Sequence, residues 1–222
     1  MVLGLKKFLF RGGAQSPADL AHDVAATLAA WRASKPPVLD DPHFLTRYVV
    51  LDIAASGTRP DEDDLLGITA VAVRAGAISP ADAFAFEIGE DADPAAVDRS
   101  LAAFLQYAAK APLVVFHSPF VAGFLQRTYK ERLGVDFQPR WIDLAWLLPS
   151  MFPEHATKPV ALDDWLEMFG IGSGGRRDTM DNTLVLARLF QKLLARAIDK
   201  DILDANTLVE ESQAATSLRR GR

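Results

Sequence analysis

Asp52 is the residue of this chain whose type and position most directly suggest chemistry. It follows four β-forming residues, Tyr48 to Leu51, and precedes a Ser56-Gly57 turn, so the pattern predicts a buried strand that ends in an acidic side chain. Burying a carboxylate is costly unless it is paired or binds a metal ion. The same aspartate could instead cap the following turn. Further carboxylates gathered beside Asp52 would favour a metal site.

A second group of candidates lies near the start of the last long helical pattern. Asp178 and Asp181 are three residues apart, so on a helix they could face the same way. Asp178 could replace a missing metal ligand, or it could stabilise the helix N-terminus through the helix dipole, which is the interpretation we favour. Arg176 and Arg177 could contact phosphate, because a guanidinium matches its geometry, or they could form an exposed basic pair.

Composition limits the classes of protein to which the chain can belong. It has 222 residues, no cysteine, a net charge of −5 and a pI near 5.4. Disulfides, thiolate metal sites and cysteine nucleophiles are therefore excluded. No apolar run approaches the roughly 20 residues that cross a bilayer, and no signal peptide is evident, so we expect a cytoplasmic protein without a membrane partner. The acidic balance argues against a non-specific nucleic-acid coat but leaves an enzyme on nucleic acid open.

The pattern divides the chain into three parts. Residues 1–46 form an N-terminal extension, with a helix predicted from Ser16-Pro17 and a proline-rich linker over 34–43. Residues 47–198 form the main domain, and residues 199–222 a polar tail that is frayed or a short helix plus disorder. We expect the apolar stripe of the first helix to dock on the main domain or on a partner subunit; it consists of Leu20, Val24, Leu28 and Trp31.

The order of elements in the main domain predicts an α/β fold. Three β-rich runs joined by short links indicate an antiparallel meander, and short apolar strands then alternate with amphipathic helices. We expect a mixed five-stranded sheet, made of the meander plus βα units, with helices on both faces. The strands are predicted near 48–52, 65–74, 83–88, 112–116 and 141–144, and the helices over 94–109, 120–133, 144–148, 161–169 and 178–198.

These elements carry short motifs in a fixed order. The first strand ends Asp52-Ile53-Ala54-Ala55-Ser56-Gly57, the segment 114–125 contains His117 and Val121, and the last helix opens Arg176-Arg177-Asp178-Thr179-Met180-Asp181. Trp141-Ile142-Asp143, the segment 162–166 and Phe169-Gly170-Ile171 lie between them. In order and spacing, residues 47–195 resemble the DEDD 3′–5′ exonuclease family of the DEDDh type, such as the proofreading epsilon subunit of bacterial replicative polymerase. The resemblance implies a ribonuclease-H-like fold.

The resemblance also implies a two-metal site. Such enzymes hold two divalent ions, magnesium or manganese, with four carboxylates, and a histidine near the last aspartate serves as general base. Carried onto this chain, Asp52 and Asp181 are retained as metal-binding positions. Ala54 stands in place of a glutamate, Val121 in place of an aspartate and Arg176 in place of the histidine. An arginine cannot deprotonate water, because it stays charged at any working pH.

Other polar residues have simpler interpretations. His117 stands where the family has a histidine that is mainly a positioning residue, so we do not favour it as a substitute base. Asp143 is expected to cap the helix that follows it rather than to bind metal. The run Asp61–Asp64 is interpreted as a solvated loop, and nothing places His155 beside Asp52.

The retained and replaced positions lead to two functional hypotheses. We favour an exonuclease-like module of nucleic-acid metabolism that has lost most or all hydrolysis and binds single-stranded nucleic acid or a protein partner. The alternative is an active 3′–5′ exonuclease that uses magnesium or manganese with Asp52, Asp181 and a substitute such as Asp178. In a further version of the first hypothesis the groove is filled: Ala54 and Val121 are apolar, and an ion pair between Arg176 and Asp181 substitutes for metal.

Overall fold

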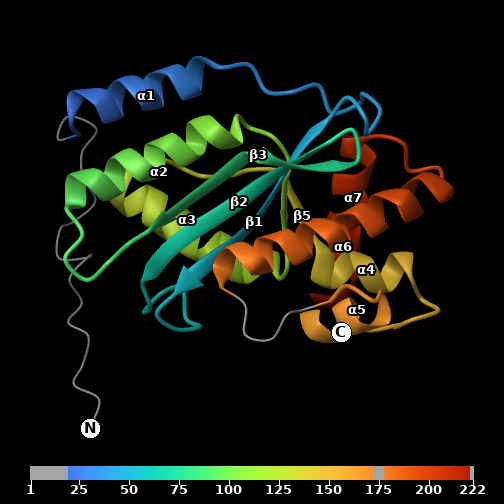
Figure 1. Cartoon of the computed structure of the whole chain (residues 1–222). Helices are drawn as coiled ribbons and strands as arrows, with labels where there is room; N and C mark the ends of the chain where they lie inside the picture. Colours follow the sequence, from blue (N-terminus) through green and yellow to red (C-terminus); the bar gives the residue numbers. More distant parts are fainter. Residues whose placement is uncertain (1–19, 173–177, 221–222) are drawn as a thin grey trace, which may run out of the picture.

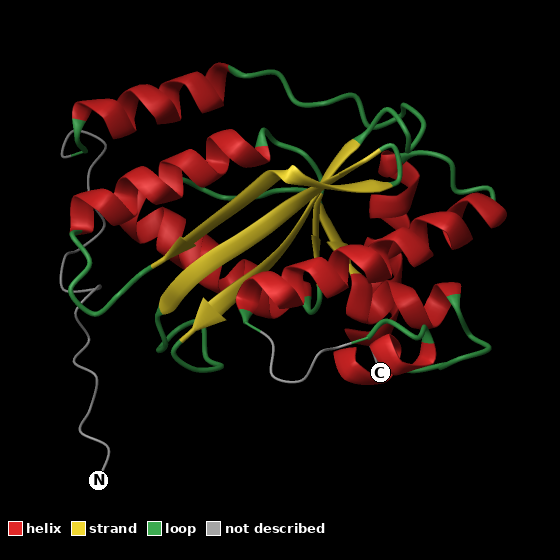
Figure 2. Ribbon diagram, viewed as in Figure 1, coloured by secondary structure: helices red, strands yellow, loops and turns green. Residues whose placement is uncertain are grey.

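Five strands form one mixed sheet in the order β3-β2-β1-β4-β5 (Figures 1 and 2). The computed structural model describes residues 20–172 and 178–220. The predicted α/β sheet, with its meander and its parallel βα units, is confirmed. The antiparallel meander consists of β1 (Arg47–Ala55), β2 (Leu65–Arg74) and β3 (Ala77–Glu87), and β4 (Leu113–Val115) and β5 (Trp141–Asp143) continue the sheet parallel to β1.

Helices cover both faces of this sheet, as expected (Figure 1). In the part of the chain that the structure describes, no helix is both long and apolar enough to span a membrane. One face carries α2 (Pro94–Ala108) and α3 (Ser118–Leu133), with α1 (His22–Ala33) packed on α2; the other carries α4 (Leu144–Met151), α5 (Leu162–Met168), α6 (Thr179–Asp199) and α7 (Ala205–Arg220).

Alternation along β1 assigns its side chains to two separate cores. Tyr48 and Val50 belong to the hydrophobic cluster under α4–α7, whereas Val49 and Leu51 belong to the cluster under α1–α3. Because successive side chains of a strand point to opposite faces, Asp52 lies on the face that α6 covers. β1 thereby delivers its one acidic side chain to the start of α6.

The parallel pairing of β1 with β4 defines the edge at which the candidate residues gather. Val49 and Val50 pair with Leu113 and Val114, so the carboxyl ends of both strands lie at one edge. α3 begins directly after β4. This arrangement follows from the βα connection, which returns the chain across the sheet between parallel strands.

The described part of the N-terminal extension, residues 20–46, is packed against the rest of the chain. Val24 and Leu28 are 1% exposed, and Leu20 and Trp31 pack on the same cluster, so the predicted docking of this stripe on the main domain is confirmed. The helix start predicted at Ser16-Pro17 lies outside the described residues.

The linker after α1 is not helical, in agreement with the prediction, and it is tied to the loop after α6. Pro42 forms a β-bridge with Asp204, and the ring of His43 contacts the Ile202 carbonyl at 3.0 Å and the Tyr48 hydroxyl at 2.5 Å. A carbonyl only accepts, so Nε2 donates to Ile202 and Nδ1 accepts from Tyr48. The linker is thereby fixed on the sheet.

The C-terminal segment differs from the sequence expectation. In place of a frayed tail or a short helix, α7 is a helix of 16 residues that packs on β5 and α4. Leu208 and Val209 are buried, and the Ser212 hydroxyl accepts a hydrogen bond from the Asp143 backbone at 2.8 Å. The polar composition of 199–222 hid these inward-facing residues, because they are few and separated by a polar face.

Candidate functional site

Asp52 is held at the junction of β1 and α6. Its backbone pairs with Thr69 on β2, and its Oδ2 accepts a hydrogen bond from the Asn182 side-chain amide at 3.2 Å. Burial raises the pKa of Asp52, and hydrogen bonds from the Ile53 backbone and from Asn182 oppose that rise. The site thus contains a half-buried carboxylate facing a neutral donor.

Threonines fix α6 in this position. The Thr69 and Thr183 hydroxyls lie 2.7 Å apart, and both reach the Thr179 carbonyl at 3.0 Å. Thr183 is fully buried and Thr69 is 6% exposed. This contact sets the rotation of the first turns of α6, and it is therefore Asn182 that reaches Asp52. From the sequence, Asn182 is only the residue that follows Asp181. The neighbouring Thr183 does not indicate how the helix is rotated on the sheet, so the contact of Asn182 with Asp52 could not be predicted.

Asp178 is the N-cap of α6. Its Oδ1 accepts a hydrogen bond from the backbone of Asp181 at 2.8 Å, which confirms the interpretation as a stabilising carboxylate at the helix start. Asp181 itself is exposed on the first turn. The acidic pair therefore lies at the helix end close to Asp52, with Asp178 occupied as a cap.

The two apolar replacements lie at different depths. Ala54 is half-buried and pairs with Gly67 at the end of β1. Val121 is 2% exposed and packs in the cluster under α1–α3, so its side chain is part of the core. Neither side chain offers an atom that ligates a metal. Within residues 20–172 and 178–220, no group of three or more histidines, aspartates or glutamates is arranged to hold a metal ion.

His117 and Asp143 form a backbone anchor at the start of α3. His117 adopts a left-handed conformation (φ 65°), and its N–H and that of Ser118 donate to the two oxygens of Asp143 at 3.0 and 2.7 Å. Asp143 also accepts from the Ala145 N–H at 3.0 Å, which confirms its predicted role as a cap. The His117 ring is exposed and lies edge-on to Phe116. The role of the His117 side chain as a positioning residue stays a prediction.

The remaining sequence candidates are separate from Asp52 or outside the described residues. Arg176 and Arg177 lie in the segment 173–177, which the structure does not describe. The His155 ring packs near Phe152 and Phe169, as expected for a residue remote from Asp52.

The acidic loop after β1 is not simply solvated, contrary to the sequence interpretation. Asp63 accepts from the Arg59 backbone at 2.8 Å, and Arg127 on α3 donates to the Asp63 carbonyl and lies 3.9 Å from Asp64. A Cβ on Gly123 would lie 2.8 Å from Pro60, so glycine allows the loop to approach α3 closely. The loop adds carboxylates to the region that follows Asp52.

Neither a protein-family model nor a curated protein sequence matches this chain. Solved structures match its fold. Cell-death related nuclease 4 (CRN-4) superposes with a TM-score of 0.54 and 14% identity over 70% of this chain and 66% of that chain. The zinc-ion-bound complex of E. coli exonuclease I (ExoI) with single-stranded DNA superposes with a TM-score of 0.53 and 15% identity, over 68% of this chain and 41% of ExoI. A full-length 3′-exonuclease superposes with a TM-score of 0.50 and 15% identity, over 68% of this chain and 83% of that chain.

The chain has the 3′-exonuclease fold. It spans less than two thirds of the length of CRN-4 and of ExoI. In this 3′-exonuclease fold, the carboxyl end of β1 and the start of α6 bring Asp52 to Asn182 and place Asp178 and Asp181 nearby in the same turn.

Proposed function

We propose that this chain is an exonuclease-fold module that binds single-stranded nucleic acid and hydrolyses it very weakly or not at all. The observation that carries the proposal is the hydrogen bond from Asn182 to Asp52. An amide N–H points at the carboxylate oxygen to which a metal ion would bind, and an N–H donor and a cation compete for the same lone pairs.

Two further observations support the loss of the two-metal arrangement. Ala54 and Val121 provide no ligand oxygen, and Val121 is embedded in the core. Two ions need several carboxylates, both to complete near-octahedral coordination and to balance charge. Asp52 and Asp181 together do not fit that requirement, so the proposal includes no metal-dependent step. The resemblance of the motifs to the epsilon subunit is part of the same proposal. We take it to reflect a shared ancestry of the fold and not a shared activity.

Single-stranded nucleic acid is the partner we infer from chemistry and fold. The ExoI match is a complex with single-stranded DNA, which supports this class of ligand for the same fold. A protein partner is the alternative. An active enzyme that recruits Asp178 as a substitute ligand has less support, because that carboxylate already caps α6.

A nuclease assay tests the proposal. Purified protein is incubated with end-labelled single-stranded DNA and RNA in magnesium, in manganese and in chelator, with Asp52→Ala as the matched variant. We expect no metal-dependent release of nucleotides. Digestion that needs metal and disappears in Asp52→Ala would establish the active enzyme instead. Binding of the same strands in chelator, measured by fluorescence anisotropy, tests the binding half of the proposal.

A further inference from the structure

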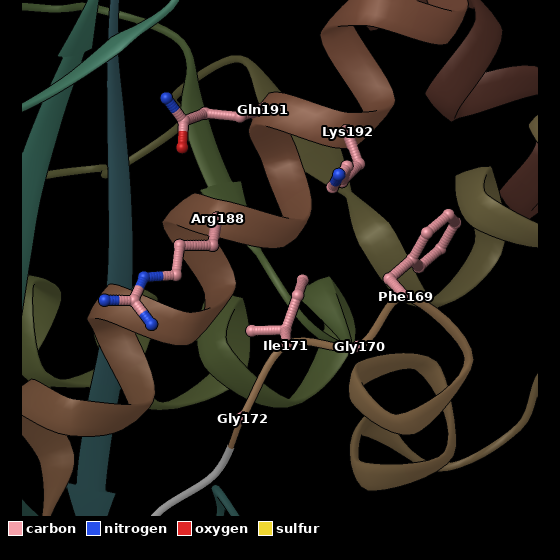
Figure 3. A pocket seen from close by; sticks show the side chains of 7 residues that line it. All are labelled: Phe169, Gly170, Ile171, Gly172, Arg188, Gln191 and Lys192. Atoms are coloured by element: carbon pink, nitrogen blue, oxygen red, sulfur yellow. The ribbon is translucent and has the colours of Figure 1, made fainter.

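A pocket of about 440 Å³ lies on the outer side of α6, against the loop that follows α5 (Figure 3). The loop residues Phe169 to Gly172 form one wall, and Arg188, Gln191 and Lys192 form the other. Its volume is in the range of pockets that bind small molecules or single nucleotides. No candidate residue of the β1 edge lines it.

Two basic residues on neighbouring turns of α6 line this pocket. Arg188 and Lys192 are four residues apart, so they share a helical face, and both are exposed. Neither forms an ion pair with any acidic residue of the described ranges. The next basic residue on that face, Arg196, is paired with Glu154 and lies over the Phe152 ring. The positive charge available to a ligand is therefore concentrated at Arg188 and Lys192.

The opposite wall is apolar and firmly held. Phe169 stacks on Trp165 with ring centroids 6.0 Å apart, and it meets Phe152 edge-on at 4.8 Å. Ile171 is 9% exposed and points toward α6 (Figure 3). An aromatic ring in such a place offers a surface on which a base can stack.

The pocket needs little rearrangement to accept a ligand. Gly170 has φ +62°, and a Cβ added at Gly170 or Gly172 would meet nothing within 4 Å, so the loop leaves open space. Gln191 donates to the Gly76 carbonyl at 2.7 Å, which ties this wall to the β2–β3 turn. Fixed walls lower the entropy lost on binding.

The charge of the α6 side chains differs between the start of the helix, near Asp52, and the pocket. Asp178 and Asp181 lie at the helix start, whereas Arg188 comes seven residues after Asp181, which is about 10 Å further along the axis. Of the charges that the structure describes on α6, those at the helix start are negative and those at Arg188 and Lys192 are positive, so the second position is the one that attracts a phosphate. A guanidinium and an ammonium on one face suit a phosphate oxygen cluster.

We propose that the pocket formed by Arg188, Lys192, Gln191 and the loop 169–172 binds a phosphate group of single-stranded nucleic acid, with the adjacent base or sugar against Phe169 and Ile171. The inference rests on the proposed function and names the surface that carries it. The binding surface is then the basic side of α6 and not the carboxylates at the end of β1.

The test compares two charge-matched double variants for binding of a labelled oligothymidylate in chelator, measured by fluorescence anisotropy over a range of salt concentrations. Arg188→Gln/Lys192→Gln should weaken binding roughly tenfold and lower the slope of log affinity against log salt by about 0.7, because the pocket holds one phosphate and each lost phosphate contact on a single strand removes about 0.7. Lys130→Gln/Lys200→Gln removes two exposed lysines elsewhere and should leave affinity nearly unchanged.

The possible results distinguish a failure of the proposed function from a failure of the proposed pocket. If wild-type protein binds neither DNA nor RNA strands, the proposed function itself is wrong, and this inference falls with it. If wild-type protein binds but the Arg188/Lys192 variant binds equally well, or the two double variants lose the same affinity, only the pocket is wrong. Displacement by a stoichiometric amount of thymidine monophosphate would assign the pocket to a free nucleotide and overturn the inference of a strand.

Discussion

The side-chain amide of Asn182 donates a hydrogen bond to Asp52 across the junction of α6 and β1, at 3.2 Å. This contact joins residues 130 positions apart in the sequence. Asn182 is a neutral partner, and within residues 20–172 and 178–220 the half-buried carboxylate of Asp52 forms no ion pair. The stability of this junction should therefore respond to the charge of Asp52.

Replacing Asp52 with asparagine should stabilise the protein at neutral pH. Burial raises the pKa of Asp52 above its ordinary value of 3.8, so the folded protein binds a proton more tightly than the unfolded chain. Stability then falls as pH rises from about that value through the folded pKa, and the loss persists at neutral pH. We expect a gain on the order of 1 kcal/mol, or about 2–4 °C in melting temperature.

Urea unfolding of wild type and Asp52→Asn at neutral and acidic pH measures this gain. The difference should shrink at acidic pH, where the wild-type carboxyl is protonated as well. Asp181→Asn, at an exposed position of α6, serves as the control and should not stabilise. Loss of stability in Asp52→Asn at neutral pH would show that the ionised carboxylate is well compensated.

Restoring the two missing carboxylates should destabilise the fold unless metal is supplied. Ala54→Glu adds a charge on the same face of β1 as Asp52, and Val121→Asp puts a carboxylate in the core, where Val121 is 2% exposed. We expect a loss of at least about 3 kcal/mol in chelator, because an unpaired buried charge is among the most costly substitutions. Manganese at millimolar concentration should recover part of the loss.

The uncharged pair Ala54→Gln/Val121→Asn separates charge from packing. It should lose stability through packing but show no recovery with manganese. Equal stability of the acidic pair and the wild type in chelator would contradict a repacked, metal-free site.

Asp178 should contribute to stability as a cap and not as a metal ligand. Asp178→Ala removes the acceptor for the Asp181 N–H, which lies 2.8 Å away, and should cost about 1 kcal/mol. Asp178→Ser should retain most of that stability, since serine is also a good N-cap. Thermal unfolding with and without manganese checks both variants. A metal-dependent rise in melting temperature that only the wild type shows would instead assign Asp178 to a metal site.

His43 should make the protein lose stability as pH falls below neutrality. Burial lowers the pKa of His43 from its ordinary value of 6.5, while the Ile202 carbonyl and Asp204 oppose the shift. The unfolded chain therefore takes up a proton before the folded protein does. The contribution of the neutral ring is complete above pH 6.5 and is lost as pH falls from there toward the folded pKa.

Urea midpoints measured across this range for wild type and His43→Gln test that expectation. The variant is less stable at neutral pH and should show a shallower decline toward acid. An identical pH dependence in both proteins would mean that other groups cause the decline.

Removing α7 should unfold the main domain. A chain that ends at Asp204 loses Leu208, Val209 and Ser212, all buried, and leaves β5 and α4 uncovered. Circular dichroism and thermal unfolding should show loss of the cooperative transition. A truncated chain that melts cooperatively near the wild-type temperature would instead support the domain boundary expected at residue 198.

Local chemistry explains which parts of the fold could be predicted. β2 follows a continuous apolar run and Ala75-Gly76 forms the expected turn, with φ 49° and 72°. The helix caps Asp143 and Asp178 could be predicted, because a carboxylate just before a helix accepts hydrogen bonds from the free backbone N–H groups of the first helical turn. β3 begins at Ala77, earlier than the run near 83–88 suggests, because its pairing with β2 imposes the strand on half-exposed residues.

The sequence by itself determined the sheet, its helices and the presence of one acidic side chain at the end of the central strand, since these depend on periodicity and turn residues close together in the chain. Only the tertiary structure decided what meets Asp52. The contacts of Thr69 with Thr183 and Thr179 set the rotation of α6 on the sheet, and a helix rotated by one residue presents a different side chain. That rotation brings Asn182 to Asp52 and leaves Arg188 and Lys192 on the outer face of the helix.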